Sequence, residues 1–213
     1  MDQSYEGFYG EFDTPSKEVG SLLMGADNIV GNDYELEFRT EDGRVVAWLK
    51  NKFGADAGFF DAESSRKLQL ANARGQKIRA LLSFVAYSDL PEPGHYWGQM
   101  AVFCFNPAYE TEMNAFVDRV AQRLSEGIRP NINLGSQAVK KIFDETDWLP
   151  SDTVPLPKAG KGTAILKDHQ SMSEKAIEQG RARNIGCYVV SWAFIAIVVI
   201  AIAFVIAKLA GLA

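Results

Sequence analysis

Cysteine and histidine are scarce in this chain of 213 residues. Its two cysteines are Cys104, in a strand-like run, and Cys187, beside a long apolar segment, so neither a disulfide framework nor a secreted disulfide-rich domain is expected. The two histidines, His95 and His169, are 74 positions apart, and neither stands in the spacing of a zinc site. The sequence therefore predicts no metal ion and no other cofactor.

Catalytic motifs are also missing. The segment KAGKGT (158–163) lacks two parts of a phosphate-binding loop, because Pro155 occupies the position of the first glycine and Gly162 follows Lys161 where a hydroxyl residue is needed. We find no nucleophile placed beside a base, and the acidic run DETD (144–147) is typical of a solvated helix end. We expect a protein that is not an enzyme; catalysis would need a site assembled from scattered residues.

Positive charge is deficient in the first part of the chain. Residues 1–151 hold 15 Lys and Arg against 23 Asp and Glu, a net charge of −8, within a total of −5. Such an acidic region repels nucleic acid and anionic lipid over long range. Residues 158–183 carry six basic and three acidic residues, a net charge of +3, which favours an anionic membrane surface.

Charge is absent altogether from residues 186–207, a run of 22 residues rich in Ile, Val, Phe and Ala. As a helix this run would be roughly 33 Å long, enough to cross the hydrocarbon layer. We therefore predict a transmembrane helix over residues 185–208, followed by a short tail, 209–213. The amino terminus, MDQSYEGFYGEF, has no apolar core, so no signal peptide is expected.

The flanks of this span predict its orientation. Basic residues are concentrated before it and only Lys208 follows it, so the amino-terminal side is expected to be cytoplasmic. The residues expected at the membrane interface are Arg181, Arg183, Tyr188, Trp192 and Lys208. Small residues spaced by four, Ala203, Ala207 and Gly211, form a ridge that would permit a homo-oligomer.

Strand patterns dominate from Glu18 to Phe105. The segment YELEFR (34–39) alternates apolar and charged residues, and EDGR (41–44) is typical of a hairpin turn leading into VVAWL (45–49). Further strands are expected at 57–60, 77–87 and 96–105, with a short helix capped by Asp61 or Ser64 and ended by Gly75. Residues 1–17 show no period and predict a loop or arm.

Helical patterns follow. Apolar residues recur at spacings of three and four from Met113 to Leu124, and a second helix over 135–149 is expected to be capped by Ser136. Three prolines between Pro150 and Gly160 predict a tether, and residues 171–183 have a helical composition. The expected organisation is an arm (1–17), a barrel (18–106), a helical extension packed on the barrel (107–149), a juxtamembrane tether (150–184), the span and the tail.

Three segments resemble the HIRAN domain, a small barrel found alone in bacteria and fused to helicases and nucleases. VVAWL is similar to the family's Ala- and Val-rich strand, GADAGFF (54–60) to its Gly-x-x-Ile-Gly-Tyr-Leu-Pro stretch, and SSRKLQLANARG (64–75) to its short helix closing on glycine. The resemblance covers residues 18–105 and implies an α+β fold: a small SH3-like β-barrel with a short inserted helix, here followed by two amphipathic helices and the transmembrane helix.

The sequence departs from this family where ligands bind. The family's Asn-Pro-x-Asp turn is replaced by RTEDGR (39–44), and SLLMG (21–25) stands where members that bind DNA ends place an arginine and tyrosines. Because those groups stack on bases and contact phosphate, nucleic-acid binding is not expected to transfer to this chain.

Candidate partner-binding residues follow from local concentrations of charge and aromatic rings: Arg66, Lys67, Arg74, Lys77, Arg79, Tyr96 and Trp97. The basic residues could bind an acidic partner or could form a solvated face with local acidic partners. The two aromatic residues could be an exposed contact or could close the barrel. The sequence favours a single-pass, tail-anchored membrane protein whose cytoplasmic HIRAN-like domain binds an unknown protein. The alternatives are binding of nucleic-acid ends at the membrane and a non-catalytic subunit of a larger membrane complex.

Overall fold

The computed structural model of this protein describes residues 5–182. The chain divides into two compact units, residues 1–170 and residues 171–213. Within residues 5–182 no helix has the length and apolar character that crossing a membrane requires. The predicted span, 185–208, lies outside the described residues.

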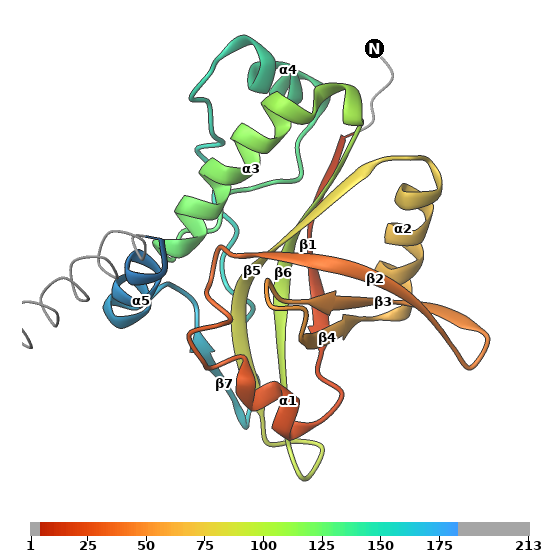
Figure 1. Cartoon of the computed structure of the whole chain (residues 1–213), viewed down its shortest axis with the longest axis vertical. Helices are drawn as coiled ribbons and strands as arrows, with labels where there is room; N and C mark the ends of the chain where they lie inside the picture. The colour runs from red at the N-terminus through yellow and green to blue at the C-terminus, as the bar shows by residue number, and fades with distance from the viewer. Residues whose placement is uncertain (1–4, 183–213) are drawn as a thin grey trace, which may run out of the picture. The chain divides into compact units, whose positions relative to one another are not determined.

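The elements follow one another in the order β1 (Tyr5–Asp13), α1 (Lys17–Leu22), β2 (Asp33–Glu41), β3 (Arg44–Lys50), β4 (Asp56–Phe60), α2 (Ala62–Ala73), β5 (Lys77–Ser88), β6 (His95–Phe105), the 3-10 helix η1 (Pro107–Tyr109), α3 (Glu110–Ser125), α4 (Ser136–Asp144), β7 (Thr163–Lys167) and, in the second unit, α5 (Met172–Ala182) (Figure 1).

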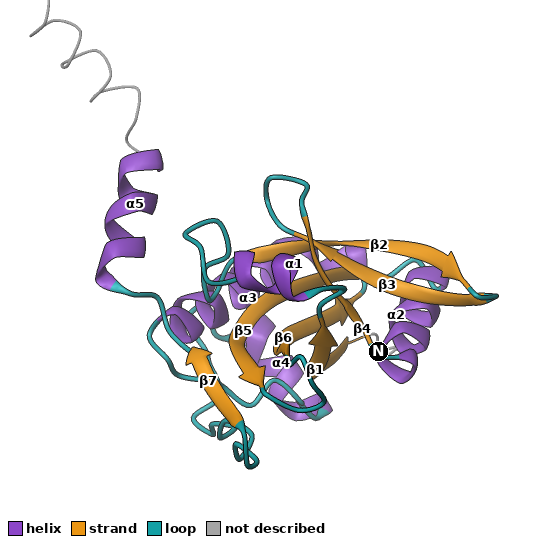
Figure 2. Ribbon diagram, turned by 90° about the horizontal axis from the view of Figure 1, so that it is seen from below, coloured by secondary structure: helices purple, strands orange, loops and turns teal. Residues whose placement is uncertain are grey.

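Six antiparallel strands form a closed barrel in the order β2-β3-β4-β1-β6-β5, and β7 extends the sheet beyond β5 (Figure 2). Closure depends on the β2–β5 ladder, which consists of only two residue pairs, Asp33 with Leu81 and Tyr34 with Ala80. The neighbouring ladder, between β5 and β6, is the longest in the sheet. It runs from the pair Lys77 and Phe105 to the pair Ser88 and His95. The α+β barrel expected from the sequence is confirmed.

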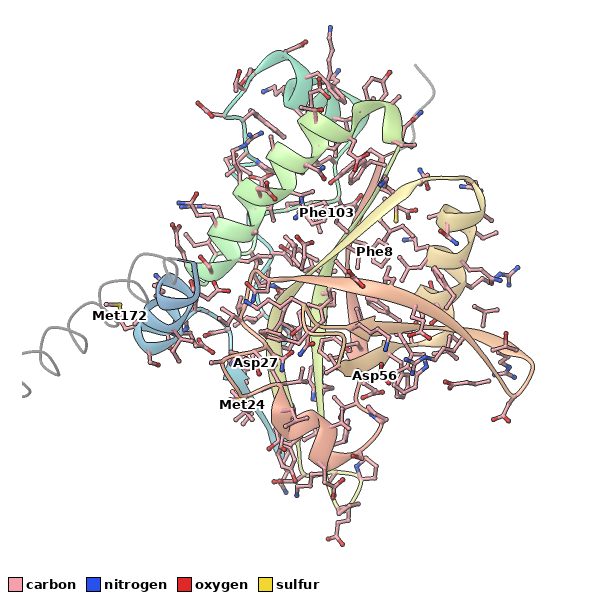
Figure 3. The ribbon with its side chains drawn as sticks, viewed as in Figure 1. Phe8, Met24, Asp27, Asp56, Phe103 and Met172 are labelled. Atoms are coloured by element: carbon pink, nitrogen blue, oxygen red, sulfur yellow. The ribbon has the colours of Figure 1, made fainter. Side chains whose placement is uncertain are left out.

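Two apolar cores lie on opposite faces of β5 and β6. One fills the barrel and includes Leu82 and Met100, with Leu68 and Ala71 of α2. The other lies between the outer face of the sheet and the helices α3 and α4, and it includes Leu81 and Ala101. Because both faces are buried, these strands are almost continuously apolar. In Figure 3, Phe8 and Phe103 mark the two sides, toward α2 and toward α3 respectively.

Most of the predicted elements are confirmed. The 34–39 strand, the 41–44 turn with Asp42 and Gly43 at positive φ, and the strands at 45–49, 57–60, 77–87 and 96–105 all form. The inserted helix begins at Asp61, whose side chain accepts a hydrogen bond from Ser64 N, and it ends before Gly75 at φ 72°. The stripe from Met113 to Leu124 is the buried side of α3.

The expected arm over residues 1–17 is wrong, because β1 lies between β4 and β6 in the barrel. The sequence of β1 does not show the alternation of apolar and polar side chains expected of a strand, because two of its positions are glycine. On one face, Gly7 leaves room for the carbonyl of Ile132, and a Cβ there would lie 2.2 Å from that oxygen. On the other face, Gly10 packs against the ring of Phe60. A glycine that admits another chain segment interrupts an apolar pattern without interrupting the strand.

The strand pattern expected from Glu18 onward is also wrong at its start. Ser16 caps the helix α1 by accepting a hydrogen bond from Val19 N. The connection from α1 to β2 is held by Asn28, whose side-chain oxygen accepts hydrogen bonds from Tyr34 Oη (2.7 Å) and Asn51 Nδ2 (3.2 Å). Because this polar group has buried partners, residues 23–32 form a packed loop between α1 and β2 instead of a strand.

The tether expected over residues 150–184 is wrong for 150–170, which belong to the first unit. Asn131 N donates to Asp152 O and Val154 N to Arg129 O, both at 2.8 Å. The guanidinium of Arg129, which is buried, donates to Pro155 O (2.7 Å), and β7 pairs with β5. Proline prevents a helix but permits this extended course. Residues 172–182 form α5, as the helical composition of 171–183 indicates.

The second expected helix, 135–149, is shorter than predicted and ends at Asp144. Gly135, not Ser136, is its N-cap residue. Trp148 and Leu149 lie beyond the helix and pack against the outer core.

We expect Gly7→Ala to lower the free energy of unfolding by about 1–3 kcal/mol, because the methyl group displaces the segment that crosses β1. Urea unfolding of the full chain measures this change. Gly160→Ala is the matched control, since the nearest atom to its new Cβ is Thr163 Oγ1 at 4.0 Å. Equal stability of the two variants would contradict the close approach at Gly7.

Candidate functional site

A groove opens where β2 and β5 separate. It has a volume of about 510 Å³, and its lining comes from the start of β2, the end of α2 and the start of β5. The lining residues are Asp33, Tyr34, Glu35, Leu36, Phe38, Asn72, Gln76, Lys77, Ile78 and Arg79. In Figure 1, β2 crosses in front of β5 while α2 stands beside them. We refer to this feature as the seam groove.

The register shows why the groove exists. Continued beyond Tyr34–Ala80, the β2–β5 ladder would pair Leu36 with Ile78, but the ladder stops at Tyr34. From Glu35 to Glu41, β2 has one strand partner, β3, which pairs with one of its two edges. Within residues 5–182, no strand pairs with the other edge of β2 beyond Tyr34.

The pairing of β2 with β3 shows which backbone N–H and C=O groups point toward the open edge. The two-residue turn at Asp42–Gly43 makes Glu41 and Arg44 a hydrogen-bonded pair. Hydrogen-bonded pairs alternate along an antiparallel ladder, so the backbone groups of Leu36 and Phe38 point away from β3, toward the groove. The hydrogen bond from Leu82 N to Asn32 O, 3.0 Å, fits the same alternation on the β5 side.

Arg79 lies at one rim of the seam groove. It forms ion pairs with Asp33 on β2 and with Asp118 on α3, where the Nη1–Oδ1 distance is 2.9 Å. Burial by itself would lower the pKa of Arg79, but the two carboxylates outweigh it and the pKa is raised. The side chain thus joins both sides of the seam to α3, and its charge is neutralised locally.

The remaining rim charges divide into paired and unpaired groups. Lys77 forms an ion pair with Glu110 at 3.3 Å. Glu35 is exposed and has no ion pair among the described residues. The groove lining itself carries two acidic residues, Asp33 and Glu35, and two basic residues, Lys77 and Arg79, so its net charge is zero. Glu110 and Asp118 on α3 lie outside the lining and pair with these two basic residues.

A four-residue ion cluster lies on the outward face of the barrel beside the groove. Arg39 contacts Glu37 (2.9 Å) and Asp56 (2.8 Å), and Lys50 contacts the same two carboxylates. Figure 3 places Asp56 near β3 and β4. The hydrogen bonds from Arg39 and Lys50 lower the pKa of Asp56 to about 2. Within this cluster Glu37 is paired with both Arg39 and Lys50, whereas Glu35 has no ion pair among the described residues.

The predicted basic residues do not form one patch. Lys77 and Arg79 line the groove. Lys67 forms an ion pair with Glu6 at 2.6 Å and lies over the ring of Phe8. Arg66 and Arg74 are exposed on and beside α2, outside the groove lining. Three of the five basic side chains are thus held by local carboxylates, which agrees with the alternative of a solvated face.

The two predicted aromatic residues belong to the barrel wall. Tyr96 packs against the inner core and against Tyr87, with ring centroids 5.0 Å apart. Trp97 donates from Nε1 to Ser88 Oγ at 2.9 Å and meets the ring of Phe84 edge-on. Neither lines the groove. Of the predicted interface residues, Arg183, Tyr188, Trp192 and Lys208, with the Ala203–Ala207–Gly211 ridge, lie outside the described residues, as does the side chain of Arg181.

Nucleophiles and metal ligands are not gathered in the described part of the chain. Within residues 5–182, no group of three or more His, Cys, Asp or Glu side chains could hold a metal ion. Cys104 is buried in the inner core, and burial raises the pKa of its thiol to about 12. The thiolate is thereby strongly disfavoured at neutral pH.

Comparison of this chain with protein-family models, with curated proteins and with solved structures found no match.

Sequence reasoning missed Glu35, Asn72 and Gln76 as parts of the site. The signals were present: the strict alternation of 34–39 places Glu35 outward, and the helix stop at Gly75 places Asn72 and Gln76 at one end of α2. What was missing was the β2–β5 register, because nothing in the sequence relates Tyr34 to Ala80.

We expect an NMR titration of the full chain in detergent to give Asp56 a midpoint near pH 2, and Arg39→Gln to raise it toward the ordinary value of 3.8. The pKa of Asp56 is lower in the folded protein than in the unfolded chain. The ion cluster therefore contributes its full stabilisation at pH values above the unfolded-state pKa, and this contribution is lost as the pH falls through the folded-state pKa. An Asp56 midpoint unchanged by the substitution would refute the ion cluster.

Proposed function

We propose that this chain is a single-pass, tail-anchored membrane protein whose cytoplasmic HIRAN-like domain binds another protein. The observation that carries the proposal is the seam groove, where an unpaired strand edge, an apolar floor and charged rims meet on one surface. Exposed strand edges that are not covered by the fold are sites where a second polypeptide can pair.

The distribution of charge supports a protein ligand over a nucleic acid. Lys77 and Arg79, the two basic residues that line the groove, are each held by carboxylates, and so is Lys67. Phosphate binding depends on cations that are free to replace counterions. The aromatic rings of Tyr96 and Trp97, which could have stacked on bases, are engaged in barrel packing.

The membrane assignment is supported by the chain beyond the described residues. The uncharged run 186–207 has the length of a membrane-spanning helix, and basic residues are concentrated on its amino side. Anchoring would hold the domain at the bilayer surface and raise its effective concentration toward partners there. The resemblance to the HIRAN barrel is supported by a six-stranded closed barrel with an inserted helix that ends before Gly75.

We expect the full chain to remain in the membrane pellet after carbonate washing. The double variant Ile197→Arg/Val198→Arg should shift it to the supernatant, because each arginine near the centre of a span costs about 3 kcal/mol on insertion scales. Protease added to sealed vesicles with the cytoplasmic face outward should digest the amino-terminal region. Release of the unaltered chain by carbonate would overturn the membrane assignment.

Crosslinking of the full chain in native membranes, followed by purification and mass spectrometry, tests protein binding. The proposal predicts a discrete crosslinked protein that is retained after a salt wash. Single-stranded DNA and RNA oligonucleotides added at low salt are expected not to bind. Retention of oligonucleotides that falls steeply with salt would favour the nucleic-acid alternative.

A further inference from the structure

We propose that the seam groove binds its partner as an added β-strand. An extended peptide pairs with the open edge of β2, and a basic side chain of the peptide contacts Glu35. This inference rests on the proposed function, and it specifies the conformation and the charge of the ligand.

The backbone provides the first step. The N–H and C=O groups of Leu36 and Phe38 point toward the groove, and within the described residues no strand pairs with them. An incoming strand that meets both residues gains main-chain hydrogen bonds at a spacing set by the alternation of the ladder. The peptide residues opposite Leu36 and Phe38 then direct their side chains to the same side as those two residues.

The floor of the groove accepts apolar side chains. Leu36, Phe38 and Ile78 are half-buried and pack against the inner core. They line the groove together with Asn72, near the end of α2, and Gln76, which follows that helix. Side chains on the inward face of an added strand would complete the burial of these three residues, and this burial stabilises binding in proportion to the apolar area covered.

The charged residues along the groove predict which side chains the peptide carries on its outward face. Along the rim, Lys77 and Arg79 are held by Glu110, Asp33 and Asp118, while Glu35 has no ion pair within residues 5–182. On the same face Glu37 is engaged by Arg39 and Lys50. A lysine or arginine opposite Glu35 therefore meets the available carboxylate, and the two basic residues of the lining, being paired already, leave no free cation to attract an acidic peptide.

Another open edge in the first unit, that of β7, fits an added strand less well. The strand β7 is only five residues long. Its pairing with β5 is interrupted between Val85 and Ala86, so Leu166 bulges out of the ladder. Short, bulged edges are the usual protection against pairing with another chain, and the open edge of β2 has neither feature from Glu35 to Glu41.

A fluorescent peptide of about seven residues, valine alternating with lysine, is the first probe, since a strand of roughly 23 Å matches the open edge. It is titrated against the full chain in detergent and followed by anisotropy. We expect binding, and weaker binding by about tenfold when the valines are N-methylated, because those amides would donate to β2. N-methylation of the lysines is the matched control, since their amides point away from β2 and binding should persist.

Substitutions in the protein provide the second test. Glu35→Arg should lower the affinity for the lysine peptide about three- to tenfold. It should raise the affinity for a peptide in which glutamate replaces lysine. Glu63→Arg, the same change on the exposed first turn of α2, should leave both affinities unchanged. Circular dichroism verifies that both variants are folded. Equal effects of the two substitutions, or equal loss from both N-methylated peptides, would overturn strand addition in the seam groove.

Native membranes separate this inference from the proposed function. Both are supported if the crosslinked partner of the unaltered chain is lost from Glu35→Arg and kept by Glu63→Arg. A partner captured equally by both variants overturns strand addition in the groove and leaves protein binding intact. Absence of any discrete partner of the unaltered chain overturns protein binding itself.

Discussion

Closure of the barrel through two residue pairs is the constraint on which the rest of this structure depends. Asp33–Leu81 and Tyr34–Ala80 bring β2 onto β5, and beyond them the two strands separate. The separation leaves room for the end of α2, whose Leu68 and Ala71 enter the inner core. It also leaves one edge of β2 unpaired. The same geometry that completes the barrel therefore creates the seam groove.

The seam is held together by groups from several parts of the chain. Arg79 links β5 to Asp33 on β2 and to Asp118 on α3. From the inner side of the same ladder, Tyr34 donates to Asn28 in the buried connection between α1 and β2. Because α3 also covers the outer faces of β5 and β6, the helical layer supports the strand that forms one wall of the groove. The groove is thus built on rigid elements, as recognition by a preformed site requires.

Charge in this protein is organised pair by pair. The ion cluster of Glu37, Arg39, Lys50 and Asp56 occupies the outward face beside the groove, and Lys67 is held by Glu6. Exposed pairs of this kind contribute little to stability individually. Their effect on the recognition proposed above would be larger, because they leave Glu35 as the carboxylate of the groove lining without an ion pair among the described residues. The two basic residues that line the groove are both paired with carboxylates, and this is why we propose a basic peptide as the ligand in preference to a phosphate group.

The sequence by itself determined those features that depend on local periodicity. Alternation defined the strand over 34–39, apolar runs defined the strands over 77–87 and 96–105, the Asp42–Gly43 turn defined the hairpin, and the spacing from Met113 to Leu124 defined α3. Only the tertiary structure decided which segments meet. Gly7 and Gly10 conceal a central strand, because the groups that need their space come from Ile132 and Phe60. The residues after Pro150 join the barrel through contacts to Arg129. The β2–β5 register, and with it the groove, relates residues 46 and 48 positions apart, and no local pattern encodes such a pairing.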